Sequence, residues 1–124
     1  MKKIVLKRGE HDLKSVLDFL PSELRSFNWS LLEFDGILDP GSSFDVNVLS
    51  YEAVNSSKGF SMSSNALNEF MRYLREVYDL ILVGSLGEIP YSDGRIEDRE
   101  RYPVVIEVFD GGDWEISLKD DLLN

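Results

Sequence analysis

The chain has 124 residues, of which 13 are Lys or Arg and 23 are Asp or Glu, so its formal charge is −10. An acidic surface repels phosphate, which excludes most nucleic-acid binders, because these neutralise phosphates with Lys and Arg. The length fits a single domain over residues 1–124, and 43% hydrophobic residues can fill a core of that size. The absence of Cys excludes disulfides, thiolate nucleophiles and thiolate metal sites.

The first expected element is a short strand over residues 3–7. The apolar stretch in it ends at Leu6, which is too short for the core of a secretion signal. The longest apolar run, residues 80–86, is also too short to cross a bilayer. We therefore expect a soluble cytoplasmic protein with no membrane partner.

Residues 12–62 are expected to form one short helix and three strands. Leu13, Val16, Leu17 and Leu20 follow helical spacing within residues 12–24, with Asp12 available as N-cap. Residues 29–38 predict a strand with a bulge at Asp35-Gly36, and the alternation of Phe44, Val46 and Val48 predicts a second strand beside it. A further short strand is expected over residues 58–62.

The most regular helical pattern covers residues 64–78, after an N-cap at Ser63 or Ser64. It places Arg72 and Glu76 at the i, i+4 spacing of an ion pair. Residues 79–86 lack polar alternation, which predicts a strand covered on both faces in the middle of a sheet. The fold class is thus α+β, a mostly antiparallel sheet carrying the 64–78 helix and the shorter N-terminal helix packed on it.

A long connection over residues 87–103 is the first candidate site. Connections of this length are uncommon in compact domains and are often functional. A mobile solvated loop is the alternative explanation. The acidic and aromatic side chains of this connection are the first candidates for partner binding: Tyr91, Asp93, Glu97, Asp98, Glu100 and Tyr102.

Residues 104–109 and 113–119 predict a C-terminal hairpin. A three-residue loop, with Gly112 in the left-handed position, pairs Ile106 with Ile116 and gives the hairpin one apolar face. A two-residue loop would instead set Glu107 against Ile116. We therefore prefer the three-residue loop.

The preferred register sets Glu107 opposite Glu115 and Phe109 opposite Asp113 on the other, open face of the hairpin. Like charges that face each other destabilise a sheet, so stability alone does not favour the glutamate pair. A cationic partner would relieve the repulsion. An arginine of the long connection, Arg99 or Arg101, would relieve it equally well.

No residue pattern in the chain identifies a reaction. The single histidine, His11, has no nucleophile beside it, and the segment around Ser85 lacks the first glycine of a G-x-S-x-G elbow. Asp110 and Asp113 offer two carboxylates without the spacing of a calcium loop. We expect no catalytic residue, no metal site and no cofactor.

The negative charge is concentrated in the C-terminal third. Residues 1–78 hold nine basic and eleven acidic side chains, whereas residues 79–124 hold four basic and twelve acidic ones. The first part has a net charge of −2 and the second of −8. Such clustering speeds encounter with basic partners, and aromatic side chains within it can act as buried anchors.

The chain resembles the immunity proteins of bacterial contact-dependent growth-inhibition and polymorphic toxin systems. The resemblance rests on its size, its charge, its lack of Cys and its α+β layout, together with the segments 29–36 and 105–110. The resemblance implies a non-enzymatic inhibitor that binds a toxin domain, often a basic nuclease, and blocks its active site or a nearby surface. It does not indicate which residues bind. The charge argument supplies these residues: Tyr91, Asp93, Glu97, Asp98, Glu100, Tyr102, Glu107, Phe109, Asp113 and Glu115.

Two other functions fit the same sequence. One is a small-molecule-binding or hydrolytic domain with a pocket between helix and sheet, and with Tyr91, Asp93 and His11 near its mouth. The other is a nucleic-acid mimic that blocks a DNA-binding protein with carboxylates spaced like phosphates.

Overall fold

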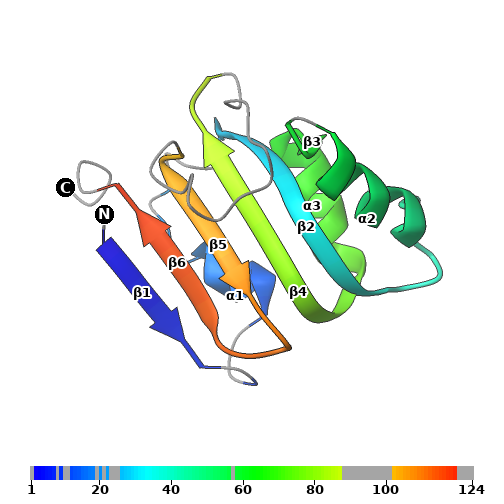
Figure 1. The fold of residues 1–124 in the computed structure, drawn as a ribbon, viewed down its shortest axis with the longest axis horizontal. Helices are drawn as coiled ribbons and strands as arrows, with labels where there is room; N and C mark the ends of the chain where they lie inside the picture. Colours follow the sequence, from blue (N-terminus) through cyan, green and yellow to red (C-terminus); the bar gives the residue numbers. More distant parts are fainter. Residues whose placement is uncertain are drawn as a thin grey trace.

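The computed structural model describes residues 2–7, 9, 12–18, 20, 22, 26–56, 58–87 and 102–119. Its elements are β1 (Lys2–Leu6), α1 (Leu13–Asp18), β2 (Asn28–Leu38), α2 (Val46–Asn55), β3 (Phe60–Met62), α3 (Ser64–Tyr73), β4 (Leu74–Ser85), β5 (Val104–Val108) and β6 (Trp114–Leu118). The strands form one antiparallel sheet in the order β1-β6-β5-β4-β2-β3 (Figure 1). The α+β class is confirmed, and β4 lies inside the sheet as predicted.

The three helices pack on one face of the sheet. In Figure 1, α1 and α3 lie behind the strands. Buried side chains of α1, α2 and α3, such as Val16, Leu49 and Phe70, join Leu80 and Ile106 of the sheet in one core cluster. A second cluster consists of Leu32, Ile81, Val83, Tyr102 and Val105. Because strand side chains alternate, it lies on the opposite side of the sheet, which we call the helix-free face because none of the described helices covers it.

The strand predicted at residues 44–48 is wrong, because Asp45 is the N-cap of α2 and residues 46–48 form its first turn. The Asp45 carboxylate accepts hydrogen bonds from the backbone N–H groups of Asn47 (2.8 Å) and Val48 (3.3 Å) and so caps the helix. Leu49 and Ala53, four residues apart, are both buried. A capped start and helical spacing of apolar residues outweigh the strand propensity of two valines.

The helix predicted over residues 64–78 begins as expected but ends at Tyr73. Ser63 caps it by accepting from the N–H of Ala66 (3.2 Å). From Leu74 the chain is extended and pairs with β2, beginning with a hydrogen bond from Asp39 N–H to the carbonyl of Tyr73 (2.7 Å). Pairing with an eleven-residue strand thus replaces the last helical turn.

The predicted Arg72–Glu76 ion pair is therefore wrong. Glu76 belongs to β4, and the guanidinium of Arg72 lies 3.8 Å from the carboxylate of Glu69, three residues earlier on α3.

The predicted bulge at Asp35-Gly36 is confirmed by a shift in the β2–β4 register at that point. Gly36 is required there, because a Cβ would collide with the backbone carbonyl of Glu76. Two further shifts, between Leu31 and Glu33 and between Ile37 and Leu38, were not expected.

The hairpin register is confirmed, since Ile106 pairs with Ile116. The turn differs from the expectation: Asp110 (φ 50°) and Gly111 (φ 64°) are left-handed, and Gly112 is not. The N–H of Gly112 bonds the carbonyl of Phe109 (2.8 Å), as in a type I′ turn. Asp-Gly is favoured in such turns because their twist matches that of the strands.

The N-terminal helix is shorter than predicted in the part that is described. Asp12 caps α1 by accepting from the N–H of Ser15 (2.8 Å), and α1 ends at Asp18. Residues 19, 21 and 23–25 of the expected helix lie outside the described residues. Among the described residues, none of the helices has the length and the apolar character that a membrane span requires.

Candidate functional site

The predicted partner-binding residues fall into two groups. Tyr91, Asp93, Glu97, Asp98 and Glu100 lie outside the described residues, as do Arg99 and Arg101. The other five are Tyr102, Glu107, Phe109, Asp113 and Glu115, all of which are described.

The hairpin face that holds Glu107 and Glu115 is not open as expected. The two residues lie opposite each other, as the register predicted, but Glu107 is only 2% exposed. The carboxylate of Glu115 is 3.0 Å from the Nζ of Lys3 on β1, the neighbouring strand. The cation that pairs with Glu115 therefore lies on the N-terminal strand, which the sequence argument did not consider, whereas Arg99 and Arg101 lie outside the described residues.

Tyr102 was expected as an exposed anchor, and this is wrong because the side chain is 1% exposed. It belongs to the cluster on the helix-free face with Ile81 and Val105. Its hydroxyl has no hydrogen-bond partner in the described structure. A buried hydroxyl without a partner costs stability, since it loses its hydrogen bonds to water.

Three carboxylates gather where β2 and β4 run side by side. Asp35 pairs directly with Asp79, and Glu33 pairs with Ile81 next to it. Burial raises the pKa of Glu33 above its ordinary value of 4.5, and the charges of Asp79 and Asp35 raise it further. None of the ion pairs among the described residues involves these three side chains.

The turn between β5 and β6 extends this acidic region. The N–H of Asp110 donates to the carboxylate of Asp79 (3.0 Å), and the N–H of Gly111 donates to the carbonyl of Tyr78 (2.7 Å). Asp110 and Asp113 are exposed, and Phe109 is 38% exposed. The turn therefore brings further carboxylates and an apolar ring next to Tyr78 and Asp79 of β4.

Tyr78 lies beside the same turn and is 41% exposed. Its hydroxyl donates a 2.6 Å hydrogen bond to the carboxylate of Glu76. This bond raises the pKa of Tyr78, and the negative charges of Glu76 and Asp35 act in the same direction.

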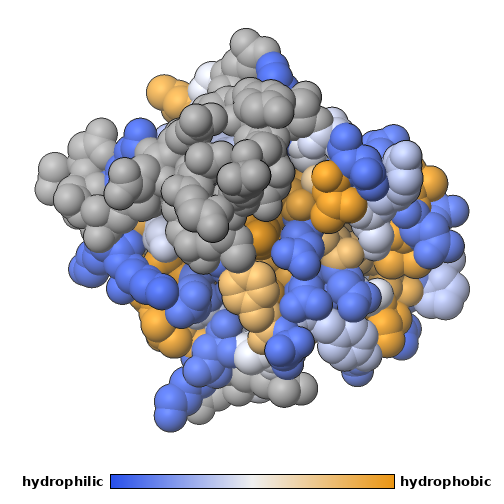
Figure 2. Space-filling model, in the orientation of Figure 1, coloured by the Kyte–Doolittle hydropathy of each residue, from blue (hydrophilic) through white to orange (hydrophobic). Residues whose placement is uncertain are grey.

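We use the name acidic surface for Glu33, Asp35, Asp79 and Asp110 with the exposed rings of Tyr78 and Phe109. Figure 2 looks onto the helix-free side and shows hydrophilic side chains beside apolar ones on its coloured part. Sequence reasoning found Phe109 and missed the others. Glu33 and Asp35 are two residues apart on one strand, a spacing that places them on one face, but their approach to Asp79 depends on β4 lying next to β2.

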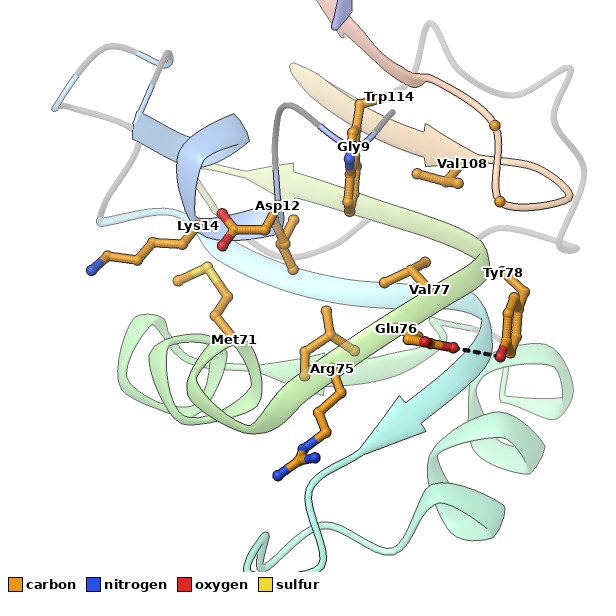
Figure 3. Close-up of a pocket in the computed structure, with 14 residues that line it drawn as sticks. Gly9, Asp12, Lys14, Met71, Arg75, Glu76, Val77, Tyr78, Val108 and Trp114 are labelled. Carbon is orange, nitrogen blue, oxygen red and sulfur yellow. Dashed lines mark hydrogen bonds between the residues drawn. The ribbon is translucent and has the colours of Figure 1, made fainter. Parts of the chain in front are cut away.

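A cavity of about 370 Å³ lies at one end of the core, between α1, the α3–β4 junction and the β5–β6 turn (Figure 3). The apolar part of its lining includes Leu13, Val77, Val108 and Trp114. The acidic residues among its described lining are Asp12 and Glu76. His11, Tyr91 and Asp93, which the sequence placed at the mouth of a pocket, lie outside the described residues.

No group of three His, Asp or Glu side chains in the described part of the chain is placed to hold a metal ion.

Comparison of the chain with protein-family models, with curated proteins and with solved structures finds no match.

Proposed function

We propose that this protein is a non-catalytic inhibitor that binds a basic protein domain through the acidic surface. The observation that carries the proposal is the grouping of three carboxylates on neighbouring strands, where Asp35 faces Asp79 directly and Glu33 is two residues away. Burial raises the pKa of Glu33, and the charges of Asp79 and Asp35 raise it further. Like charges on neighbouring strands cost the free protein stability. Lys or Arg side chains of a partner would turn this repulsion into attraction on binding.

The exposed rings at the edge of the acidic surface suit the same role. Carboxylates speed the encounter with a basic partner but contribute little affinity where they stay solvated. Aromatic side chains supply buried contact area, and Tyr78 and Phe109 are 41% and 38% exposed beside the carboxylates. The charged groups would thus orient the partner, and the rings would anchor it.

The proposed action is competition with a nucleic-acid substrate. A nuclease binds phosphates in a cationic cleft, and the same cleft would accept the acidic surface. The proposed action is that of the immunity proteins of toxin systems that the chain resembles, and a cytoplasmic location is part of the proposal. In this proposal Glu33, Asp35, Asp79 and Asp110 take the role first given to Glu107, since a residue 2% exposed cannot reach a partner.

The first test is co-expression with the product of the directly upstream gene, because an immunity gene should follow its toxin gene. The proposal expects that product to contain a basic domain, to co-purify with this chain and to lose its toxicity. An upstream product that is not toxic, or that stays toxic and unbound, would refute it.

The surface itself is tested by Asp35→Asn with Asp79→Asn, which remove charge and keep the side-chain size. Tyr51→Ala is the matched control, because Tyr51 on α2 is 68% exposed and lies outside the acidic surface. The proposal expects weaker co-purification from the double variant and unchanged co-purification from the control. The reverse result would place the binding surface on α2.

A small-molecule-binding or hydrolytic domain is the second candidate function, and the cavity beside Trp114 favours it. Its volume of about 370 Å³ falls at the lower end of the range of small-molecule sites, roughly 300–1,000 Å³. A thermal-shift screen tests this candidate: a metabolite that raises the melting temperature by several degrees would support it.

A further inference from the structure

Strand β1 forms one edge of the sheet (Figure 1). β6 pairs with it on one side, and among the described residues no strand pairs with its other side. An open edge presents backbone N–H and C=O groups that can bind a further strand. β1 contains no Pro, and the side chain of Val5 is 54% exposed on it. This edge is therefore a surface to which another extended segment can add.

The hydrogen-bond pattern of the sheet determines which residues of β1 turn their backbone groups outward. The N–H of Lys119 donates to the carbonyl of Pro103 (3.0 Å), so Lys119 and every second residue before it on β6 bond toward β5. The residues between them, such as Ile116, bond toward β1, where Ile116 faces Ile4. The neighbours of Ile4 on β1 therefore direct their N–H and C=O groups away from the sheet. These outward residues are Lys3 and Val5.

The charges of the edge select one register for pairing with a second copy of β1. Lysines on an edge strand normally oppose such pairing, because like charges would face each other. Three antiparallel registers bring outward groups together and pair three or more residues of β1. Those centred on Lys3 and on Val5 place Lys3 opposite Lys3 or Lys7 of the second copy. The register centred on Ile4 pairs all five residues of β1 and places Lys3 opposite Val5.

The register centred on Ile4 is favourable on both faces of the sheet. Ile4 packs against the core cluster on the helix side, and there it would contact Ile4 of the second copy. On the helix-free face, the methylene stem of Lys3 would cover the exposed Val5 of the second copy. Val5 is the cross-strand partner of Glu115, so Lys3 would lie two strand spacings, about 10 Å, from Glu115 of the second copy. The two long side chains can span this gap, and each basic edge thus meets an acidic residue of the other copy.

We propose that the chain forms a twofold-symmetric dimer by antiparallel pairing of two β1 strands centred on Ile4. Each of the two Lys3–Val5 pairs exchanges two backbone hydrogen bonds, and the two six-stranded sheets become one continuous sheet. The interface is isologous, the commonest kind in homo-oligomers. The acidic surface on β2 and β4 is separated from β1 by β5 and β6, so both copies keep it uncovered. The dimer is therefore independent of the proposed inhibitor function.

Two measurements on the full chain test the proposal. Two short strands make a small interface, and interfaces below about 1,200 Å² are typically weak, so sedimentation equilibrium is measured from about 10 µM to about 1 mM. It should show a monomer–dimer equilibrium. Amide hydrogen exchange, followed by NMR at both ends of this range, reports the register. Exchange at Lys3 and Val5 should slow several-fold at the higher concentration, whereas exchange at Ile4, whose N–H bonds to β6, should change little.

Val5→Lys opposes the dimer, because the new ammonium would face Lys3 of the second copy. It lies opposite Glu115 in its own chain, so the fold is retained. Two such like-charge contacts should weaken dimerisation about tenfold. Val54→Lys is the matched control, since Val54 is 58% exposed on α2, and it should leave dimerisation unchanged. Adding Lys3→Glu to Val5→Lys should restore the dimer, because each facing pair then joins opposite charges.

Four results would overturn the proposal. They are a monomer up to about 1 mM, a dimer in which exchange at Lys3 and Val5 does not slow, a dimer that Val54→Lys weakens as much as Val5→Lys does, and a failure of Lys3→Glu to restore the Val5→Lys dimer. None of these results bears on whether the acidic surface binds a basic domain, so the two proposals fail separately.

Discussion

Asp35 and Asp79 lie directly opposite each other on β2 and β4, so two like charges share one position across the sheet. Glu33 lies two residues before Asp35. Burial raises the pKa of Glu33, and the charges of both aspartates raise it further. Opposed like charges cost a sheet on the order of a few tenths of a kcal/mol. The fold thus keeps an arrangement that its own stability does not favour, which is why we propose that these residues bind a partner.

Glu33→Gln should stabilise the protein near neutral pH and not in acid. A carboxyl group whose pKa is raised on folding stabilises the folded state below its unfolded pKa, about 4.5, and this contribution is lost as pH rises through the folded pKa. The amide imitates the protonated form at every pH. Urea unfolding should show a gain of a few tenths of a kcal/mol near pH 7 and none near pH 3.5. A gain of equal size at both pH values would contradict the electrostatic explanation.

Gly111→Ala should destabilise the hairpin more than Gly112→Ala. Gly111 has a φ of 64°, a left-handed conformation that costs a residue with a Cβ roughly 1–2 kcal/mol. Gly112 is not left-handed, although a Cβ there would lie 3.0 Å from the carbonyl oxygen of Phe109. The free energies of unfolding of the two variants check the turn type, and a larger loss for Gly112→Ala would favour the three-residue loop with a bulge.

Tyr102→Phe should keep or raise stability, by up to about 1 kcal/mol. The hydroxyl is buried without a hydrogen-bond partner in the described structure, so its removal relieves a cost and leaves the ring packing intact. Tyr78→Phe is the comparison, because that hydroxyl donates to Glu76. Thermal or urea unfolding measures both. A marked loss of stability in Tyr102→Phe would show that the hydroxyl does have a partner.

Asp45→Ala should cost about 1 kcal/mol, whereas Asp45→Asn should cost little, because Asn caps a helix as well as Asp does. The prediction rests on the hydrogen bonds that the Asp45 carboxylate accepts from two backbone N–H groups at the start of α2. Unfolding in urea together with the helical circular dichroism signal checks it. If both variants match the parent protein, Asp45 does not cap a helix.

Elements with local signals were predictable from the sequence. Ser63 marks the start of α3, Asp35-Gly36 the bulge in β2, and the apolar alternation around Asp110-Gly111 the hairpin register. Each depends on residues a few positions apart, so a pattern in the chain suffices to find it.

Features that depend on distant pairing were not predictable. The end of α3 is set by the pairing of Leu74 with Leu38 on another strand, and the expected helix ran through it. Tyr102 follows a charged segment in the sequence, yet its ring is buried against β2, β4 and β5. Asp79 lies close to Asp35 because β4 is the neighbour of β2 in the sheet, and that strand order cannot be read from the sequence. The candidate site was therefore predicted in its charge and in Phe109, but not in most of its residues.

The most direct test of the binding proposal is the association rate with the product of the upstream gene, measured at low and high salt. Asp35→Asn with Asp79→Asn should slow association about tenfold at low salt and flatten its salt dependence, because long-range attraction acts mainly on the association rate. Glu52→Gln removes one exposed charge on α2 and should leave both nearly unchanged. If the double variant associates as fast as the parent protein, with the same salt dependence, the acidic surface is not where the partner binds.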